Sequence, residues 1–229
     1  VFQDPASSLN PRSLIFRSLE RPLLINGYSK GNAEKLIIET ASKVNLGREL
    51  LDRFPYELSG GQQQRVSIMR AIMLQRKLLV LDEPTSALDV SVQAQTLNEL
   101  LKLQNDYDMS YLFISHNLSV VRYMSDRICV MYGGKLMEIG RTDDVYYHYI
   151  HPYTFGLLSS VPPLHPKYRS RKKYLLTGDM PSLIGDLNGC RFCSRCRYKK
   201  EICENEEPLM REVEKGHFAA CHFAGKLGF

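Results

Sequence analysis

A short apolar run that ends in two acidic residues constrains the fold of this chain most strongly. The run Leu-Leu-Val-Leu at residues 78–81 leads directly into Asp82 and Glu83. A second run, Tyr-Leu-Phe-Ile at residues 111–114, leads into Ser115 and His116. Continuous apolar runs of this length are typical of strands buried on both faces of a parallel sheet. The sequence therefore predicts two strands of one such sheet.

A helical pattern from Val92 to Leu103 separates the two runs and predicts a right-handed strand–helix–strand crossover. Ligands of such sheets bind beyond the carboxyl ends of the strands, where Asp82, Glu83 and His116 would lie. Asp82 would hold Mg²⁺, directly or through water. Glu83 would orient and polarise an attacking water, and His116 would hydrogen-bond a γ-phosphate. The alternative is a polar strand end with helix caps and a structural histidine.

A glycine pair opens another helical pattern. Ser59, Gly60 and Gly61 precede a pattern that runs from Gln62 to Gln75, with Ser59 as the expected N-cap. Backbone N–H groups at two glycines and the positive end of a helix suit an anion. An ordinary glycine turn before a helix is the alternative.

The remaining patterns divide the chain of 229 residues. A helical pattern opens at residues 32–35 and ends near Gly47, and two β-like runs at 127–132 and 135–139 flank Gly133-Gly134 and predict a hairpin. The character of the sequence changes after Arg141, so we place a boundary near residue 150. We expect one domain at residues 1–150, with a helical subdomain at about 5–75, and an extension at residues 151–229.

Taken together, these motifs resemble the ATP-binding cassette (ABC) ATPases. The matching segments are Leu58–Gln62 (signature), Leu78–Glu83 (Walker B and catalytic glutamate), Ser86–Asp89 (D-loop), His116 (switch histidine) and Gln3 (Q-loop). The resemblance implies an α/β fold: a P-loop NTPase-like ABC ATPase domain with a helical subdomain and a small Cys-rich C-terminal extension. It also implies ATP and Mg²⁺ as ligands and ATP hydrolysis as the activity.

The same resemblance divides the roles of these residues. Glu83, His116 and Gln3 would be catalytic and, with Asp82, would serve the nucleotide on this chain's own side. The family works as a head-to-tail pair, so a signature contacts ATP that is held mainly by the partner subunit. The residues expected to contact nucleotide are Ser59, Gly60, Gly61, Gln62, Asp82 and Asp89.

Three further segments are similar to the oligopeptide/dipeptide importer subfamily of these ATPases. They are Gln-Asp-Pro-Ala-Ser-Ser-Leu-Asn-Pro-Arg at residues 3–12, His-Pro-Tyr-Thr at 151–154, and the tail from Gly189 to His222. The resemblance implies a peripheral subunit on the cytoplasmic face of the plasma membrane, docked on permease subunits. A second ABC ATPase subunit, identical or different, and an external substrate-binding protein would complete the importer. Peptides, nickel and some sugars are substrates of such importers.

The charge of the chain does not change these expectations. The net charge of +5 is compatible with an anionic partner and equally with a solvated basic surface. A basic run at residues 167–173 is more often a solvated linker than a nucleic-acid patch, and we expect no nucleic-acid partner. No apolar stretch approaches the roughly 20 residues of a membrane helix.

Five of the six cysteines cluster near the C-terminus: Cys190, Cys193, Cys196, Cys203 and Cys221. Without a secretion signal, such clustering favours a metal centre over disulfides. We rank a [4Fe–4S] cluster first, zinc second and reduced structural thiols third. In the resembling ATPases the pattern matches Cys190, Cys196, Cys203 and Cys221, which leaves Cys193 as an extra thiol or an alternative ligand. We expect Cys129 to be a core residue and His217 and His222 to be structural.

Two other functions compete with an importer subunit. ABC ATPases of DNA repair or translation usually carry tandem cassettes or long coiled-coil insertions, and neither is found in this sequence. A non-catalytic remnant that only binds partners would explain a sequence without a Walker A motif, but the acidic pair and His116 argue against a long-standing loss of catalysis.

The phosphate-binding Walker A loop (Gly-x-x-x-x-Gly-Lys-Ser/Thr) is not found in the sequence, and Gly134-Lys135 continues with Leu136 in the predicted hairpin. The loop should precede Gln3, and its strands would belong to the core. We therefore expect the purified chain to be of low stability, to bind nucleotide weakly and to hydrolyse ATP slowly. Phosphate release from ATP by the purified chain measures this, and robust turnover would refute it.

Overall fold

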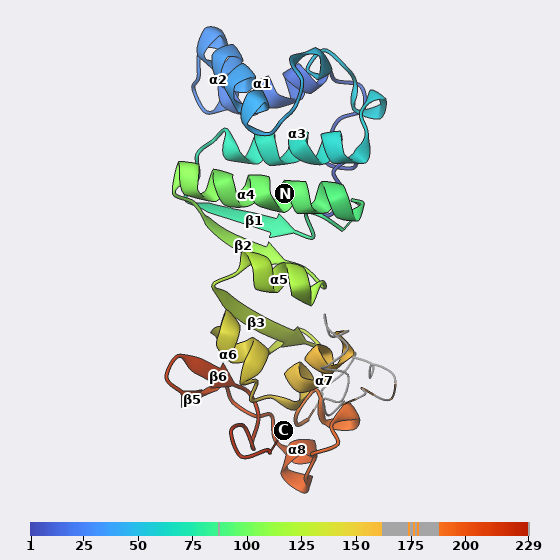
Figure 1. The fold of residues 1–229 in the computed structure, drawn as a ribbon, viewed down its shortest axis with the longest axis vertical. Coiled ribbons are helices and arrows are strands. Elements are labelled where there is room, and N and C mark those ends of the chain that lie inside the picture. Colours follow the sequence, from blue (N-terminus) through green and yellow to red (C-terminus); the bar gives the residue numbers. More distant parts are fainter. Residues whose placement is uncertain (87, 162–173, 175, 177, 179–187, 229) are drawn as a thin grey trace. The chain divides into compact units, whose positions relative to one another are not determined.

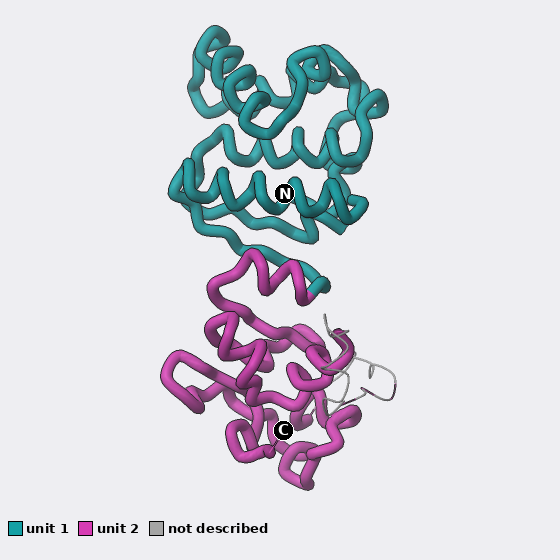
Figure 2. Tube along the Cα trace, viewed as in Figure 1, with its two compact units in different colours: residues 1–117 teal, residues 118–229 magenta. Residues whose placement is uncertain are grey.

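The computed structural model describes residues 1–86, 88–161, 174, 176, 178 and 188–228. The basic run at residues 167–173 lies outside these residues. The chain divides into two compact units, residues 1–117 and 118–229 (Figure 2), and each is described by itself. The predicted boundary near residue 150 falls within unit 2, and the division into domains 1–150 and 151–229 stays a prediction.

Unit 1 contains a helical part followed by a strand–helix–strand segment (Figure 1). Its elements are α1 (Ile15–Ile25), α2 (Lys30–Lys43), η1 (Arg48–Leu50), η2 (Pro55–Glu57), α3 (Gly60–Ile72), β1 (Leu78–Asp82), α4 (Val90–Tyr107) and β2 (Ser110–Ile114). The strands β1 and β2 pair in parallel, from Leu78 opposite Ser110 to Asp82 opposite Ile114. The predicted strand–helix–strand crossover is therefore confirmed, and its right-handedness stays a prediction.

One face of the β1–β2 pair is buried and the other is open, which differs from the expectation of two buried faces. Leu79 and Leu81 are buried on the face that they share with Tyr111 and Phe113. On that face α4 packs, and the Tyr111 hydroxyl donates to the Leu100 carbonyl at 2.8 Å. The opposite face exposes apolar side chains, with Leu78 59% exposed. Among the described residues the pair has a single covering layer, so alternate apolar side chains meet water.

Helix α3 begins where the sequence predicts. The Ser59 hydroxyl accepts the Gln62 N–H at 3.3 Å, and the Gln62 side chain accepts the Ser59 N–H at 2.9 Å. This reciprocal capping box satisfies two donors that a helix start leaves free, and an N-cap of this kind contributes about 1 kcal/mol. Helix α2 begins at Lys30, slightly before the predicted start, because Ser29 caps it by accepting the Asn32 N–H at 3.3 Å.

Unit 2 contains a four-stranded antiparallel sheet in the order β3-β4-β6-β5. Its elements are α5 (Leu118–Met124), β3 (Arg127–Tyr132), β4 (Lys135–Arg141), α6 (Thr142–Tyr147), α7 (Pro152–Ser160), η4 (Cys193–Arg195), α8 (Glu201–Asn205), β5 (Arg211–Glu214) and β6 (His217–Ala219). Gly133 and Gly134 adopt φ of 55° and 78°, which glycine accepts readily and a two-residue hairpin requires. The predicted hairpin is confirmed.

A buried carboxylate joins three segments of unit 2. Glu138 of β4 accepts the backbone N–H groups of Ile150 and His151, both at 3.0 Å. Its Oε1 also lies 2.7 Å from Nε2 of His217 in β6, and both side chains are almost completely buried. A buried polar group is tolerated only when it is hydrogen-bonded, and loss of one partner typically costs about 1–3 kcal/mol. This contact therefore holds the C-terminal strands against the hairpin and the start of α7.

Along the described parts of the chain, none of the helices combines the length and the apolar character that a membrane-spanning helix needs.

His151 makes the stability of unit 2 sensitive to pH. It caps α7 by accepting the Tyr153 N–H on Nδ1 at 3.0 Å, and burial lowers its pKa from the ordinary 6.5 to about 4. Below pH 6.5 the His151 side chain of the unfolded chain binds a proton that the folded chain binds only near pH 4. The free energy of unfolding therefore decreases as the pH falls from about 6.5 to about 4. The contribution is at most about 1.4 kcal/mol per pH unit.

We expect the urea midpoint of the wild type to fall from pH 7 to pH 5 by more than that of His151→Asn, which keeps a capping acceptor but does not titrate. The exposed His148 provides the control, and His148→Asn should follow the wild type. Parallel pH profiles for the wild type and His151→Asn would contradict the role of His151.

Candidate nucleotide-hydrolysis site

Glu83 lies directly after β1 in a left-handed backbone conformation, with φ of 43°. A residue other than glycine in this region costs of order 1–3 kcal/mol and persists only where its surroundings hold it. Its N–H donates to the Ile114 carbonyl at the end of β2, at 2.9 Å, and its carbonyl accepts from Ser86 N and Oγ at 3.2 and 3.1 Å. These bonds fix the direction in which the Glu83 side chain leaves the sheet.

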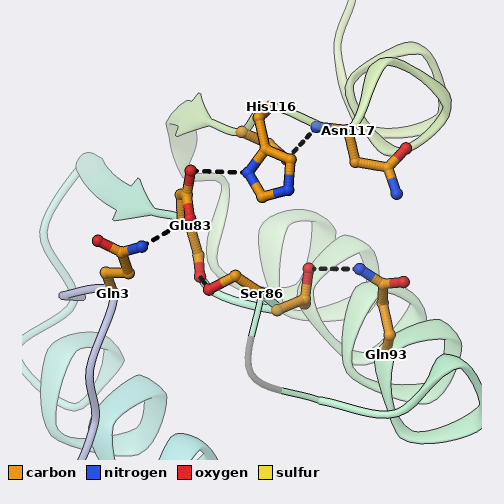
Figure 3. A network of polar contacts seen from close by, with 8 residues as sticks. Gln3, Glu83, Ser86, Gln93, His116 and Asn117 are labelled. Carbon is orange, nitrogen blue, oxygen red and sulfur yellow. Dashed lines mark hydrogen bonds and ion pairs between the residues drawn. The ribbon is translucent and has the colours of Figure 1, made fainter.

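The Glu83 carboxylate brings the three residues predicted to be catalytic into one network (Figure 3). Gln3 Nε2 donates to Oε2 at 2.8 Å, and His116 Nδ1 lies 2.8 Å from Oε1. An ionised carboxylate only accepts, so His116 donates through Nδ1 and its Nε2 points away from Glu83. Each carboxylate oxygen retains a further lone pair. Because His116 is 75% exposed, this pair adds little stability, and the contact orients the two groups.

Backbone pairing along β1 explains why Gln3 lies here. The Val1 amino group donates to the Val80 carbonyl at 2.8 Å, and the Asp82 N–H donates to the Val1 carbonyl at 3.0 Å. Val1 therefore pairs with β1 at its carboxyl half, and Gln3 follows two residues later beside Glu83. Asp82 ends β1 as predicted, and its side chain is half-buried.

The two signature glycines have different surroundings at the start of α3. A Cβ added to Gly60 would have no atom within 4 Å, whereas a Cβ on Gly61 would lie 3.1 Å from Cγ1 of Val92 in α4. Gly60 thus leaves open space at a helix N-terminus, and Gly61 allows α3 and α4 to approach closely. The structure places Ser59, Gly60, Gly61 and Gln62 together at this helix start.

Asp89 is the N-cap of α4. Its Oδ1 accepts from Ser91 Oγ at 2.7 Å, Val92 N at 3.0 Å and Ser91 N at 3.1 Å. The Ser91 hydroxyl, followed by the Val92 N–H, holds the pKa of Asp89 below its usual range. Capping accounts for its carboxylate in this structure, and the predicted nucleotide contact stays a prediction.

Sequence patterns did not indicate that Thr85 and Gln93 contact each other beside the candidate site. Gln93 Nε2 donates to Thr85 Oγ1 at 2.9 Å, in the turn that follows Glu83. A polar residue in the first turn of a helix gives no signal of its target, so only the structure reveals this contact.

The five clustered thiols line one cavity of unit 2. Around it lie Cys190, Cys193, Cys196, Cys203 and Cys221, together with His151, His222 and the rings of Phe192, Tyr198 and Phe223. Gly189, at φ of 84°, lets the chain approach closely: a Cβ there would lie 2.5 Å from the Cys203 carbonyl oxygen, and the Cys190 N–H donates to that carbonyl at 2.8 Å.

Burial raises the pKa of Cys190 to about 11 and that of Cys196 to about 12, so both thiols are protonated at neutral pH. No group of three or more histidine, cysteine or acidic side chains in the described residues is arranged to hold a metal ion. The predicted ligands thus share a cavity without forming a ligand shell. Cys129, predicted to be a core residue, is instead exposed, because it lies on the outward face of β3.

Two family models match the chain. Residues 1–86 match the family described as "ABC transporter", and residues 137–203 match "Oligopeptide/dipeptide transporter, C-terminal region".

Relatives match over nearly the whole chain. The oligopeptide transport ATP-binding protein AppF of Bacillus subtilis is 43% identical over 97% of this chain and 68% of that protein. The di/tripeptide transport ATP-binding protein DppF of Pseudomonas aeruginosa is 44% identical over 98% and 69%. The dipeptide transport ATP-binding protein DppF of Haemophilus influenzae is 45% identical over 96% and 68%.

Two solved structures share the fold. The structure of cbiO1 from Clostridium perfringens aligns with a TM-score of 0.58 at 23% identity, over 65% of this chain and 59% of that one. The ATP-binding cassette MJ0796, a dimer in a post-hydrolysis state with ADP and Pi, aligns with a TM-score of 0.55 at 26% identity, over 62% of each chain. The predicted ABC ATPase fold is confirmed, whereas the Cys-rich extension stays a prediction. The chain belongs to the ATP-binding subunits of ABC transporters, in the oligopeptide/dipeptide transporter family.

Proposed function

We propose that this chain is the subunit that binds and hydrolyses ATP in an importer of short peptides. The observation that carries the proposal is the Glu83 carboxylate, bound by Gln3 and His116 beyond the carboxyl end of β1. The names of the relatives, which specify oligopeptide, dipeptide and di/tripeptide transport, support peptides as the substrate class. The chain would act with a second ABC ATPase subunit, permease subunits and an external binding protein, at the cytoplasmic face of the membrane.

The proposed chemistry follows from the hydrogen-bonding positions of Glu83 and His116 that the network leaves unoccupied. Glu83 retains lone pairs on both oxygens, so it accepts a hydrogen bond from a water and directs that water toward the γ-phosphate. His116 donates to Glu83 through Nδ1, so a hydrogen bond from its Nε2 to the γ-phosphate would require a proton on that nitrogen as well. Gln3 fixes the other carboxylate oxygen. Asp82, a hard oxygen donor at the adjacent strand end, suits Mg²⁺, which when bound neutralises charge on the phosphates.

The signature would serve a different nucleotide. The open space at Gly60 and the positive end of α3 suit the phosphates of ATP held mainly by the partner subunit. Ser59 and Gln62 keep this helix start in place through their capping box, and Asp89 would approach the same interface from the start of α4.

The decisive experiment compares peptide uptake and ATP turnover by the natural gene product, assembled with its permease in proteoliposomes. Glu83→Gln should lower kcat by at least about 100-fold and leave ATP binding intact, because it removes the base and keeps the shape. The exposed Glu39, changed to Gln, is the matched control and should behave as the wild type. If turnover and uptake survive Glu83→Gln, hydrolysis in the transporter does not depend on Glu83 and must come from the second ATPase subunit. That result would favour the interpretation of this chain as a non-catalytic remnant.

We also propose that Cys190, Cys196, Cys203 and Cys221 bind a metal centre, with a [4Fe–4S] cluster ranked before zinc. The shared cavity and the all-sulfur donor set support it. Because the described thiols do not form a ligand shell, binding would draw them inward and release their protons. The centre would be structural or regulatory.

Anaerobic purification with metal analysis and visible absorbance tests the thiol site. We expect about four irons per chain, lost in Cys196→Ser but retained in Cys193→Ser and in the control Cys129→Ser, which lies outside the cavity. A colourless protein with one zinc per chain would show that the thiols bind zinc and not an iron–sulfur cluster. A metal-free protein would show that they are reduced structural thiols.

A further inference from the structure

The turn that carries Glu83 is held from the side of α4. Gln93 lies in the first turn of α4, and its Nε2 donates to Thr85 Oγ1 at 2.9 Å (Figure 3). Thr85 is 4% exposed, so its hydroxyl is shielded from competing water. The next residue, Ser86, donates twice to the Glu83 carbonyl. Gln93 therefore anchors the turn one residue away from the bonds that hold Glu83.

This anchor matters because the Glu83 backbone is in an unfavourable conformation. At φ of 43° the residue stays in place only while its neighbours prevent relaxation toward a common conformation. The Ile114 carbonyl holds Glu83 from the sheet, and Ser86 holds it from the turn. Loss of the Gln93–Thr85 bond would free the turn and let the carboxylate move off the positions that His116 and Gln3 define.

Helix α4 is itself fixed to the signature helix. Val92, the neighbour of Gln93, packs on Gly61 of α3. Further along, Arg65 of α3 and Glu99 of α4 form an ion pair at 3.3 Å, in which both side chains are largely buried. The first turn of α4 thus contacts the start of α3 through Val92 and the Glu83 turn through Gln93.

We propose that Gln93 is a positioning residue for ATP hydrolysis: its bond to Thr85 holds Glu83 in the conformation that activates water, and links this conformation to the position of the signature helix. The inference rests on the proposed role of Glu83. It concerns the turn and α4, and it assigns Gln93 no contact with nucleotide.

The test measures kcat and the KM for ATP of the natural gene product in its assembled transporter. Gln93→Met keeps the length of the side chain but removes the donor, and Thr85→Val keeps the shape but removes the acceptor. Each should lower kcat about fivefold to tenfold, equivalent to about 1–1.4 kcal/mol, with the KM within about twofold of the wild type. Thr85→Ser keeps the hydroxyl and should retain at least about half of the wild-type kcat.

Two controls separate positioning from loss of structure. Gln95→Met makes the same change at an exposed position of the same helix and should leave kcat unchanged. The double variant Gln93→Met/Thr85→Val should be no slower than either single variant, because one bond is lost in all three. Additive losses, a Thr85→Ser as slow as Thr85→Val, or an unchanged kcat for Gln93→Met would overturn the inference.

Glu83→Gln, measured beside these variants, identifies which proposal fails. If it abolishes turnover while Gln93→Met does not slow it, Glu83 keeps its role and the inference about Gln93 is wrong. If turnover survives Glu83→Gln, the hydrolysis site itself is wrong, and the inference that rests on it is wrong as well.

Discussion

The parallel pairing of β1 with β2 is the constraint on which the site depends. Register places Asp82 opposite Ile114, so the residues that follow each strand leave the sheet at the same edge. Glu83 comes one residue after β1 and His116 two residues after β2, and this offset brings Oε1 and Nδ1 to 2.8 Å. A shift of the register by one residue would turn alternate side chains to the other face and separate the two groups. The crossover helix α4 enforces the pairing from one face.

Sequence patterns predicted the features that arise from local chemistry. The Ser59 cap, both parallel strands and the glycine hairpin each depend on residues close together in the chain, and all of them are found. The meeting of Gln3, Glu83 and His116 was also expected, because the resemblance to ABC ATPases located the three residues before their geometry was known. Their chemical roles stay predictions that the variants above can test.

Contacts between side chains far apart in the sequence left no such signal. Glu138 and His217 are 79 residues apart, and neither the alternation of β4 nor that of β6 reveals their buried hydrogen bond. Asp89 lies at a helix start, where capping and nucleotide contact use the same residue types, so its sequence position does not distinguish the two roles. Gln93 lies in the same helix start, and nothing in the sequence indicates its contact with Thr85. The open face of the β1–β2 pair was missed for a related reason: an apolar run indicates that a strand can be buried on both sides, but it does not supply the second covering layer.

That open face has a practical consequence for work with the chain as a separate protein. Leu78, Val80, Leu112 and Ile114 are each more than two-fifths exposed, and together they form a contiguous apolar strip on a regular sheet surface. Such strips favour self-association, bind hydrophobic dyes and adsorb to detergent micelles. Sedimentation behaviour and dye fluorescence of the separate chain should therefore vary with its concentration and with detergent, and ATPase measurements need to be read alongside them.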